Sequence, residues 1–256
     1  MDLALAGHVA LVTGASRGIG KGIAAALAQE GCKLAICARG RETLAETAAE
    51  LRDSGAEVLT IARDVTEPDS AAHVVGAAIA AYGQLNVLVN NVGGNNRTPF
   101  PQQSDEEWEE VIGLNLLSGV RMTRAAIPHL AAAGGGSVVF VSSIWGRELG
   151  GSAVYVSTKA AAIGLAASLA RELAPQSIRV NSVAPGSIRF PGGSWDRRVH
   201  DDPDGMADFV EREIPGGRFG TTEEVGNVVA FLASPRASWV NGTCIPVDGC
   251  QSRSLI

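Results

Sequence analysis

Tyr155 and Lys159 stand four residues apart and have the side-chain types needed to move a proton. In a helix, residues at this spacing lie on the same face, which would bring the phenol and the ammonium group together. A free phenol has a pKa of ~10, and a nearby positive charge favours the phenolate and so lowers that pKa toward working pH. Such a phenol could exchange a proton with a carbonyl or alcohol oxygen. The pair indicates acid–base chemistry, although an incidental pair on a helix would have the same spacing.

The scarcity of both residue types favours a function for this pair. Tyr82 is the only other tyrosine, and Lys21 and Lys33 are the only other lysines among 21 lysines and arginines. A chain that otherwise uses arginine for its positive charges has placed one of its few lysines within reach of a tyrosine. We therefore expect both side chains to take part in catalysis.

The elements that would position these groups are short β-branched segments alternating with alanine-rich segments, whose apolar residues lie three and four apart. The alternation predicts a Rossmann-type doubly wound α/β fold, with a seven-stranded parallel sheet carrying helices on both faces and one domain over residues 1–256. The expected strands are His8–Thr13, Lys33–Ala38, Val58–Ala62, Val87–Val89, Ser137–Val141, Arg179–Ala184 and Thr243–Val247. The expected helices are Ile19–Glu30, Glu42–Asp53, Pro68–Tyr82, Glu106–Ala132, Ser152–Leu173 and Glu223–Ala233.

One long segment breaks this alternation. From Gly186 to about Asp204 the chain is rich in Gly, Pro and charged residues and is expected to be irregular. Loops of such length in a compact domain often serve as lids or binding loops. We expect residues 186–215 to form a loop with a short helix that covers the substrate.

A glycine-rich segment, Thr13–Gly20 with the sequence TGASRGIG, follows the first expected strand and leads into the first expected helix. Glycines let the backbone turn tightly and approach a pyrophosphate, and the helix N-terminus offers free N–H groups and partial positive charge. Glycines that merely close a turn are the alternative, but the strand–turn–helix context favours a dinucleotide site. The residues expected to line the cofactor here are Gly14, Ser16, Arg17, Gly18, Ile19 and Gly20.

The end of the second expected strand indicates which dinucleotide binds. An acid there would bind the ribose 2′-hydroxyl of NAD, whereas this strand ends in Arg39. A guanidinium can hold a 2′-phosphate with two hydrogen bonds. Arg17 of the glycine turn is expected to lie close enough to Arg39 to assist. The two arginines therefore favour NADP(H). A solvated Arg39, with Arg41 in its place, is the alternative. Asp64 and Val65 follow the third expected strand, where an adenine could lie.

Bulk composition bears on partners and compartment. With 46% hydrophobic residues, a net charge of -6 and a pI near 5.3, the chain offers no basic surface for nucleic acid or an anionic membrane. The cysteines form no CxxC pair, nothing after Met1 resembles a leader, and the apolar stretches are too interrupted for a membrane span, so we expect a cytoplasmic protein. The histidines at positions 8, 73, 129 and 200 have no ligand-like spacing, so no metal is expected.

Nearly the whole chain resembles the short-chain dehydrogenase/reductase family. The resemblance rests on three motifs that occur in the family's order: T-G-x-x-x-G-x-G, the sequence NNVG at Asn90–Gly93, and Tyr-x-x-x-Lys. The resemblance implies that Ser143 polarises the substrate oxygen, that Tyr155 donates the proton, and that Lys159 binds the ribose and lowers the tyrosine pKa. It also implies that Asn115 holds a water in a proton relay. Further cofactor contacts are implied for Asn91 and Gly93, and for Pro185, Gly186 and Ile188 in a loop over the nicotinamide.

Three positions depart from the family pattern. The interval from Ser143 to Tyr155 is one residue shorter than the family's usual thirteen, so Ser142 is an alternative catalytic serine, although Ser143 better fits the place before a small loop. Phe190 stands where the family often has a threonine that contacts a cofactor phosphate. Cys250 replaces the last glycine of the family's closing Asp-Gly-Gly.

The substrate is the least determined feature. The segments expected to face it carry Trp145, Asn95, Arg147, Phe190 and Trp195, which would give a pocket with aromatic walls and some positive character. The resemblance is strongest to the 3-oxoacyl-carrier-protein reductase group and implies reduction of a ketone or 3-oxoacyl thioester by NADPH, in a homotetramer. The alternatives are an NAD(P)-dependent alcohol or sugar dehydrogenase working oxidatively, a non-catalytic NADP-binding regulator, and an epimerase or dehydratase, whose usual second domain this length does not accommodate.

Overall fold

The sheet of this protein has seven parallel strands, as predicted, and their order is β3-β2-β1-β4-β5-β6-β7. The structure is a computed structural model, and it describes residues 1–96 and 98–255. The strands are β1 (Val9–Thr13), β2 (Lys33–Ala38), β3 (Val58–Ala62), β4 (Val87–Asn90), β5 (Gly136–Val141), β6 (Ile178–Pro185) and β7 (Cys244–Val247). The helices are α1 (Gly18–Gln29), α2 (Arg41–Asp53), α3 (Ser70–Tyr82), α4 (Asp105–Ile112), α5 (Ser118–Ala132), α6 (Ala153–Leu173), α7 (Ser194–Asp201), α8 (Pro203–Glu213) and α9 (Thr222–Ala233).

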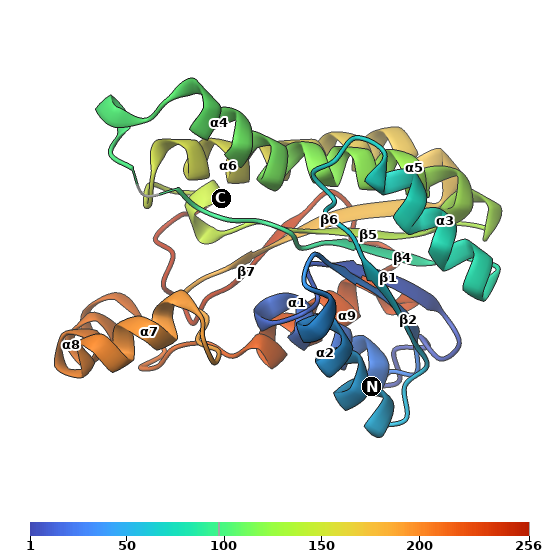
Figure 1. Cartoon of the computed structure of the whole chain (residues 1–256), viewed down its shortest axis with the longest axis horizontal. Helices are drawn as coiled ribbons and strands as arrows, with labels where there is room; N and C mark the ends of the chain where they lie inside the picture. The colour runs from blue at the N-terminus through green and yellow to red at the C-terminus, as the bar shows by residue number, and fades with distance from the viewer. Residues whose placement is uncertain (97, 256) are drawn as a thin grey trace.

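Helices cover both faces of the sheet (Figure 1). Side chains on a strand alternate between the two faces, so Val12 of β1 packs with α1, α2 and α9, whereas Leu11 packs with α3, α5 and α6. Both residues are fully buried, as expected for strands between two helix layers. The strand order reverses between β1 and β4, and ligands of open α/β sheets bind beyond the carboxyl ends of the strands at such a point.

The long helix predicted over Glu106–Ala132 is interrupted. α4 begins after a capping box formed by Ser104 and Glu107 and ends at Ile112, and a π-helical segment, Gly113–Leu117, joins it to α5. π-helical turns insert a residue and often occur at functional sites. Asn115 lies in this segment and is buried, so the interruption changes the direction in which its side chain points.

The segment expected to be irregular from Gly186 to Asp204 is irregular up to Gly193 and helical over most of its second half. It contains α7 and the start of α8, which lie apart from the sheet at one end of the molecule (Figure 1). Asp202 caps α8 by accepting a hydrogen bond from the Gly205 N–H, and Pro203 occupies the first turn, where proline is tolerated. These are start signals for a helix that the composition of the segment obscured.

One helical segment among the described residues, Ala153–Gln176, is long and apolar enough to span a membrane. The apolar stretches were expected to be too interrupted for a span, and this segment meets the criterion by length and composition only, as buried core helices also do. Its buried side, which includes Val154, Ala162 and Ala170, packs against the core. That arrangement is the one expected for a core helix of an α/β domain.

Candidate active site

A cleft of about 580 Å³ opens beyond the carboxyl ends of β1, β2, β3 and β4. Its position is the one at which the strand order predicts ligand binding. The structure brings together in this cleft the predicted residues Gly14, Ser16, Arg17, Gly18, Ile19, Gly20, Arg39, Asp64, Val65, Asn91, Gly93, Tyr155 and Lys159. Residues that the sequence reasoning did not assign to the cofactor also line it, namely Cys37, Ala38, Gly40, Thr43, Arg63, Val92, Gly94, Asn95, Leu114, Val141, Ser142 and Phe190.

The glycine turn is fixed to the neighbouring strand by Asn91. The Asn91 side-chain amide donates hydrogen bonds to the carbonyl oxygens of Thr13 (3.0 Å) and Gly14 (3.1 Å). A Cβ atom at Gly20 would clash with the Gly14 carbonyl oxygen, so only glycine lets α1 begin this close to the turn. The start of α1, where helix N–H groups lack partners within the helix, thus lies at the cleft.

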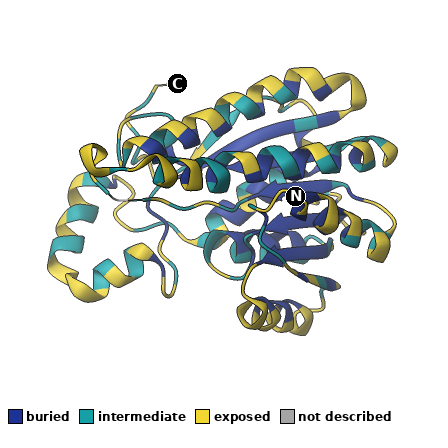
Figure 2. Cartoon of the chain, turned by 45° about the horizontal axis from the view of Figure 1, so that its top comes forward, coloured by how far each residue is buried: buried dark blue, intermediate teal, exposed yellow. Residues whose placement is uncertain are grey.

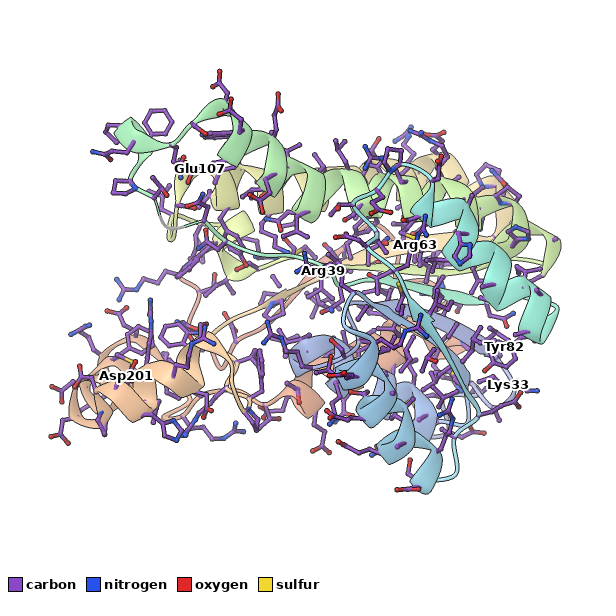
Figure 3. The ribbon with its side chains drawn as sticks, in the orientation of Figure 1. Lys33, Arg39, Arg63, Tyr82, Glu107 and Asp201 are labelled. Carbon is purple, nitrogen blue, oxygen red and sulfur yellow. The ribbon has the colours of Figure 1, made fainter. Side chains whose placement is uncertain are left out.

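Positive charge gathers where the cleft passes the ends of β2 and β3. Arg39 and Arg63 follow these adjacent strands, as Figure 3 shows, and both line the cleft with Arg17. The Arg39 side chain is 76% exposed, and its Nη1 lies 3.6 Å from Asp64 Oδ2. Arg63 was missed by the sequence reasoning, although its place directly after a strand was a usable signal.

The carboxylate of Asp64 is held in its ionised form. Burial opposes ionisation, but hydrogen bonds from the Thr66 N–H (2.9 Å) and hydroxyl (2.7 Å), together with the charge of Arg39, outweigh it and lower the pKa of Asp64. The carboxylate therefore orients Arg39 at the edge of the cleft. Arg41, the alternative to Arg39, does not line the cleft among the described residues.

Tyr155 and Lys159 lie on one face of α6, at the inner end of the cleft. The Lys159 ammonium is 5.7 Å from the centre of the Tyr155 ring and donates to the Val141 carbonyl oxygen (2.9 Å). Burial lowers the pKa of Lys159 to about 8 and raises that of Tyr155, and a hydrogen bond with the Ser143 hydroxyl lowers the Tyr155 pKa in part. In the protein by itself the phenol is thus held protonated, contrary to the expected lowering of its pKa by Lys159.

The two candidate serines have different partners. Ser142 donates its hydroxyl proton to the backbone carbonyl of Lys159 (2.8 Å), so it fastens β5 to α6. The Ser143 hydroxyl hydrogen-bonds the Tyr155 phenol and accepts from the Trp145 N–H (3.2 Å). This geometry favours Ser143 over Ser142 as the group next to the reacting oxygen.

Asn115 does not line the cleft but supports it. Its Oδ1 accepts from the Gly94 N–H (2.8 Å), and its Nδ2 donates to the Gly94 carbonyl and the Thr158 hydroxyl (both 2.9 Å). A side chain at Gly93 would meet both the Asn115 carbonyl oxygen and the Lys159 ammonium. Asn115 and Lys159 therefore lie on either side of Gly93, close enough for Asn115 to assist Lys159 in the expected proton relay.

The loop after β6 differs from its expected placement. Pro185, Gly186 and Ile188 do not line the cleft, because Gly186 lies against Asp248 and Ile188 pairs with Gly220. In this loop it is the ring of Phe190 that reaches the cleft. A Cβ atom at Gly18, whose φ is +58°, would lie 2.7 Å from this ring, so Phe190 covers the glycine turn with an apolar surface.

The residues expected to face the substrate divide into two groups. Trp145 and Asn95 line a second cavity of about 450 Å³, and Trp145 makes an edge-to-face contact with Tyr155 with ring centres 6.2 Å apart. Arg147 instead donates to the Cys244 carbonyl oxygen (2.8 Å), and Trp195 stacks on Phe209 with ring centres 4.9 Å apart.

Comparisons with known proteins agree with this geometry. A family model described as enoyl-(acyl carrier protein) reductase matches residues 14–250. The 3-oxoacyl-[acyl-carrier-protein] reductase FabG of Staphylococcus aureus is 37% identical over 246 residues, which are 94% of this chain and 96% of that protein. A tropinone reductase homolog of Arabidopsis thaliana is 38% identical over 247 residues, covering 96% and 92% of the two chains.

A solved structure extends the agreement to three dimensions. L-sorbose reductase from Gluconobacter frateurii, complexed with NADPH and L-sorbose, is 32% identical and has a TM-score of 0.94, with 100% of each chain covered. The match of fold and the match of sequence both span the glycine turn and the Tyr155–Lys159 pair. The chain therefore belongs to the short-chain dehydrogenase/reductase family and is an NAD(P)-dependent oxidoreductase.

Proposed function

We propose that this protein reduces a ketone or a 3-oxoacyl thioester to an alcohol with NADPH, and that Tyr155 is the general acid. The observation that carries the proposal is that Tyr155 and Lys159 line one cleft with the glycine turn, with the Ser143 hydroxyl hydrogen-bonded to the Tyr155 phenol. The Tyr155 phenol carries the proton that a general acid must give away; burial raises its pKa and so weakens it as an acid, and the hydrogen bond with Ser143 acts in the opposite direction. The same group would take up a proton in the oxidative direction.

The cleft fits a phosphorylated dinucleotide. The glycine turn at the start of α1, which a Cβ atom at Gly20 would obstruct, would hold the pyrophosphate. Arg39, with Arg17 and Arg63, would hold the 2′-phosphate, and this supports a preference for NADPH over NADH. Asp64 and Val65 would border the adenine, and Lys159 would bind the nicotinamide ribose. Asn91, Gly93 and the loop of Pro185, Gly186 and Ile188 complete the proposed cofactor contacts.

Each catalytic side chain has a separate task in the proposal. A bound nicotinamide supplies a hydride to the carbonyl carbon. Ser143 donates a hydrogen bond to the carbonyl oxygen, which stabilises its developing negative charge, and Tyr155 transfers the phenolic proton to that oxygen. Lys159 and Asn115 would return a proton to the phenolate through water.

A screen of carbonyl compounds tests the proposal. NADPH oxidation would be followed by absorbance with neutral ketones, keto acids, ketoses and 3-oxoacyl thioesters, and NADP reduction with the matching alcohols. We expect turnover with NADPH that exceeds turnover with NADH. Tight NADPH binding without turnover on any compound would instead favour the non-catalytic regulator, and faster turnover with alcohols at neutral pH would favour an oxidative dehydrogenase.

A homotetramer in a reducing, cytoplasmic compartment is the remaining part of the proposal. The outer face of α6 is exposed along a row of small residues, including Ala160, Gly164 and Ala167, so another helix could approach it closely. All four cysteines are free thiols. Light-scattering mass measurement is expected to give four times 26.4 kDa, and a monomer at micromolar concentration would contradict the assembly.

A further inference from the structure

Three neighbouring strands of the sheet, β5, β6 and β7, are each followed by a segment that leaves the same edge of the sheet, because the strands are parallel. The loop of residues 143–152 follows β5 and carries Ser143. Residues 186–193 follow β6 and carry Phe190, which lines the cleft. Residues 248–255 follow β7 and are called the tail here. The tail has no role in the proposed reaction, yet it contacts both of the other segments.

The tail is hydrogen-bonded to the loop after β6. The Gln251 side chain accepts from the Ser187 N–H (2.8 Å) and donates to the Ser187 hydroxyl (2.9 Å). Ser187 is buried and lies three residues before Phe190. Gly186 packs so closely on Asp248, at the start of the tail, that a Cβ atom on this glycine would lie 2.7 Å from the Asp248 Cβ. The tail thus fixes the residues that lead to the glycine-turn side of the cleft.

The tail is also hydrogen-bonded to the loop after β5. Glu148 Oε2 accepts from the Ser252 hydroxyl (3.0 Å) and from the Arg253 N–H (2.7 Å). The Glu148 side chain is half-buried and lies between Ser143 and Tyr155 in the chain. In Figure 1 the tail runs from β7 toward the start of α6, where this loop ends. Glu148 therefore anchors the loop after β5 to the tail.

The loop after β5 packs on the catalytic side of α6. A Cβ atom at Gly146 would lie 2.7 Å from the Lys159 carbonyl carbon, so the loop rests on the α6 backbone. Trp145 makes its edge-to-face contact with Tyr155, and the backbone of Gly150 lies against the indole of Trp145. A shift of this loop would therefore move the indole beside the phenol, while Tyr155 and Lys159 stay fixed on their helix.

The tail itself is held in a turn. One carboxylate oxygen of Asp248 accepts from the Cys250 N–H (3.1 Å), and the other accepts from the Ser252 N–H (2.8 Å). The Gln251 N–H donates to the Asp248 carbonyl (3.2 Å). Gln251 and Ser252, which bind the two different loops, are adjacent in this turn. The loops after β5 and β6 are thus joined through a single ordered peptide unit.

We propose that the tail is a brace between the loops after β5 and β6, and that Gln251 and Glu148 are positioning residues that set the separation of these loops for the substrate. The inference rests on the proposed carbonyl reduction for its kinetic consequence. When the brace is released, the catalytic side chains keep their own contacts, but the walls formed by Trp145 and by the loop of Phe190 lose their fixed separation. Ketone binding is then weakened without a comparable loss of kcat.

Two single variants and their double variant test the brace. Glu148→Ala and Gln251→Ala should each raise the KM for ethyl 3-oxobutanoate, a soluble 3-oxoacyl ester, about tenfold, with kcat and the NADPH Kd within about threefold of wild type. Because either change releases the same link, the double variant should have nearly the KM of the single variants. A KM raised about 100-fold in the double variant would show two independent contacts and would overturn the brace, as would a loss of kcat at unchanged KM.

Matched variants exclude a general loss of structure. Glu172→Ala removes an exposed acid in the last turn of α6, and Gln84→Ala removes a hydrogen bond to the Gly7 carbonyl (3.3 Å) at the amino ends of the strands. Both should leave the KM within about twofold. Glu148→Gln keeps an oxygen that can accept both hydrogen bonds, so its KM should stay within about threefold of wild type. A KM in Glu148→Gln equal to that of Glu148→Ala, or an equal rise in the controls, would contradict the inference.

Hydrogen exchange separates this inference from the proposed reaction, because it needs no turnover. In Glu148→Ala, amide exchange of residues 186–193 should be at least about fivefold faster than in wild type, although the hydrogen bonds of Glu148 go to the tail. Exchange of residues 143–152 should rise likewise in Gln251→Ala. Faster exchange confined to each variant's own loop would overturn the brace, whether or not the ester is reduced.

The two failures are thereby distinguishable. Linked exchange in a protein that reduces no ketone would confirm the brace and contradict the proposed function, whereas ketone reduction with unlinked exchange would do the reverse. Ser252→Ala removes one of the two hydrogen bonds to Glu148 and replaces Glu148→Ala if that variant does not fold. Its exchange in residues 186–193 should be at least about twofold faster than in wild type, and an unchanged rate would contradict the brace.

Discussion

The cofactor side of the molecule and the α7–α8 segment are built in opposite ways. Every residue of β1 is buried, and the turn that follows is tied to β4 by Asn91. Neither α7 nor α8 contains a buried residue, and Figure 2 shows both helices largely exposed at one end of the molecule. The hydrophobic core therefore fixes the positions of the groups expected to hold the cofactor. The positions of the groups expected to contact the substrate are fixed only by contacts at the surface.

A few specific contacts fix the exposed segment. The rings of Trp195, Phe209 and Phe219 pack together, and Arg189 pairs with Asp196 at 3.0 Å. Exposed ion pairs contribute little, so the aromatic cluster is the main stabilising contact. We expect substitutions there to change substrate selection at small cost to the fold, and substitutions around the cleft to alter cofactor binding or proton transfer.

The largest effect is expected for the general acid. Tyr155→Phe removes the proton donor with little change of shape and should lower kcat by about 10³-fold, with the NADPH Kd unchanged within about threefold. Tyr82→Phe is the control, because the Tyr82 hydroxyl donates to the Leu34 carbonyl (3.0 Å) near the start of β2, at the opposite end of that strand from the cleft. Steady-state kinetics and fluorescence titration measure both quantities, and turnover by Tyr155→Phe near the wild-type rate would remove Tyr155 from the mechanism.

The next effect separates the two serines. Ser143→Ala deletes the hydroxyl at the phenol and should lower kcat by about 10²-fold, whereas Ser142→Ala deletes a bond to the Lys159 backbone and should mainly lower the Tm. Each variant requires a kinetic measurement and a thermal unfolding curve. A greater catalytic loss in Ser142→Ala would transfer the role to Ser142.

Cofactor choice should change with Arg39. Arg39→Asp replaces the group proposed for the 2′-phosphate with one that suits a ribose hydroxyl, so the ratio of kcat/KM for NADPH to that for NADH should fall by about 10- to 100-fold. Arg41→Gln should leave this ratio within about threefold. If wild type prefers NADH, or if Arg41→Gln has the larger effect, the assignment of Arg39 is wrong.

A smaller effect concerns stability and pH. Lys159 has a folded-state pKa of about 8 against its usual 10.5, so between these pH values the unfolded chain binds more protons and wild-type stability rises with pH. Lys159→Met has no such dependence. The Tm of the variant minus that of wild type should therefore fall by roughly 3–6 °C from pH 7.5 to pH 10. A constant difference would show that the buried amine does not titrate in this range.

The sequence predicted the sheet because buried parallel strands and glycine-rich turns leave local signals. The β1 residues and the Thr13–Gly20 segment lie where the pattern indicated. The break at Asn115 could not be predicted, since a π-helical turn depends on tertiary contacts with Gly94 and Thr158. The preference for Ser143 over Ser142 depends on the position of the Tyr155 phenol, which the sequence does not give.

The sequence predicts the side-chain positions of the exposed segment less well, and the reason is physical. Trp195 was expected at the substrate, yet its partners Phe209 and Phe219 lie far along the chain and draw it into a cluster.

The division between the two regions is tested most directly in Trp195→Ala, by measuring the NADPH Kd and the ketone KM on the same variant. Loss of the stacked ring should loosen α7 without reaching the cleft, which Trp195 does not line. We predict an NADPH Kd within about twofold of wild type and a KM for the best ketone raised about tenfold. A Kd that weakens about tenfold with an unchanged KM would contradict the account.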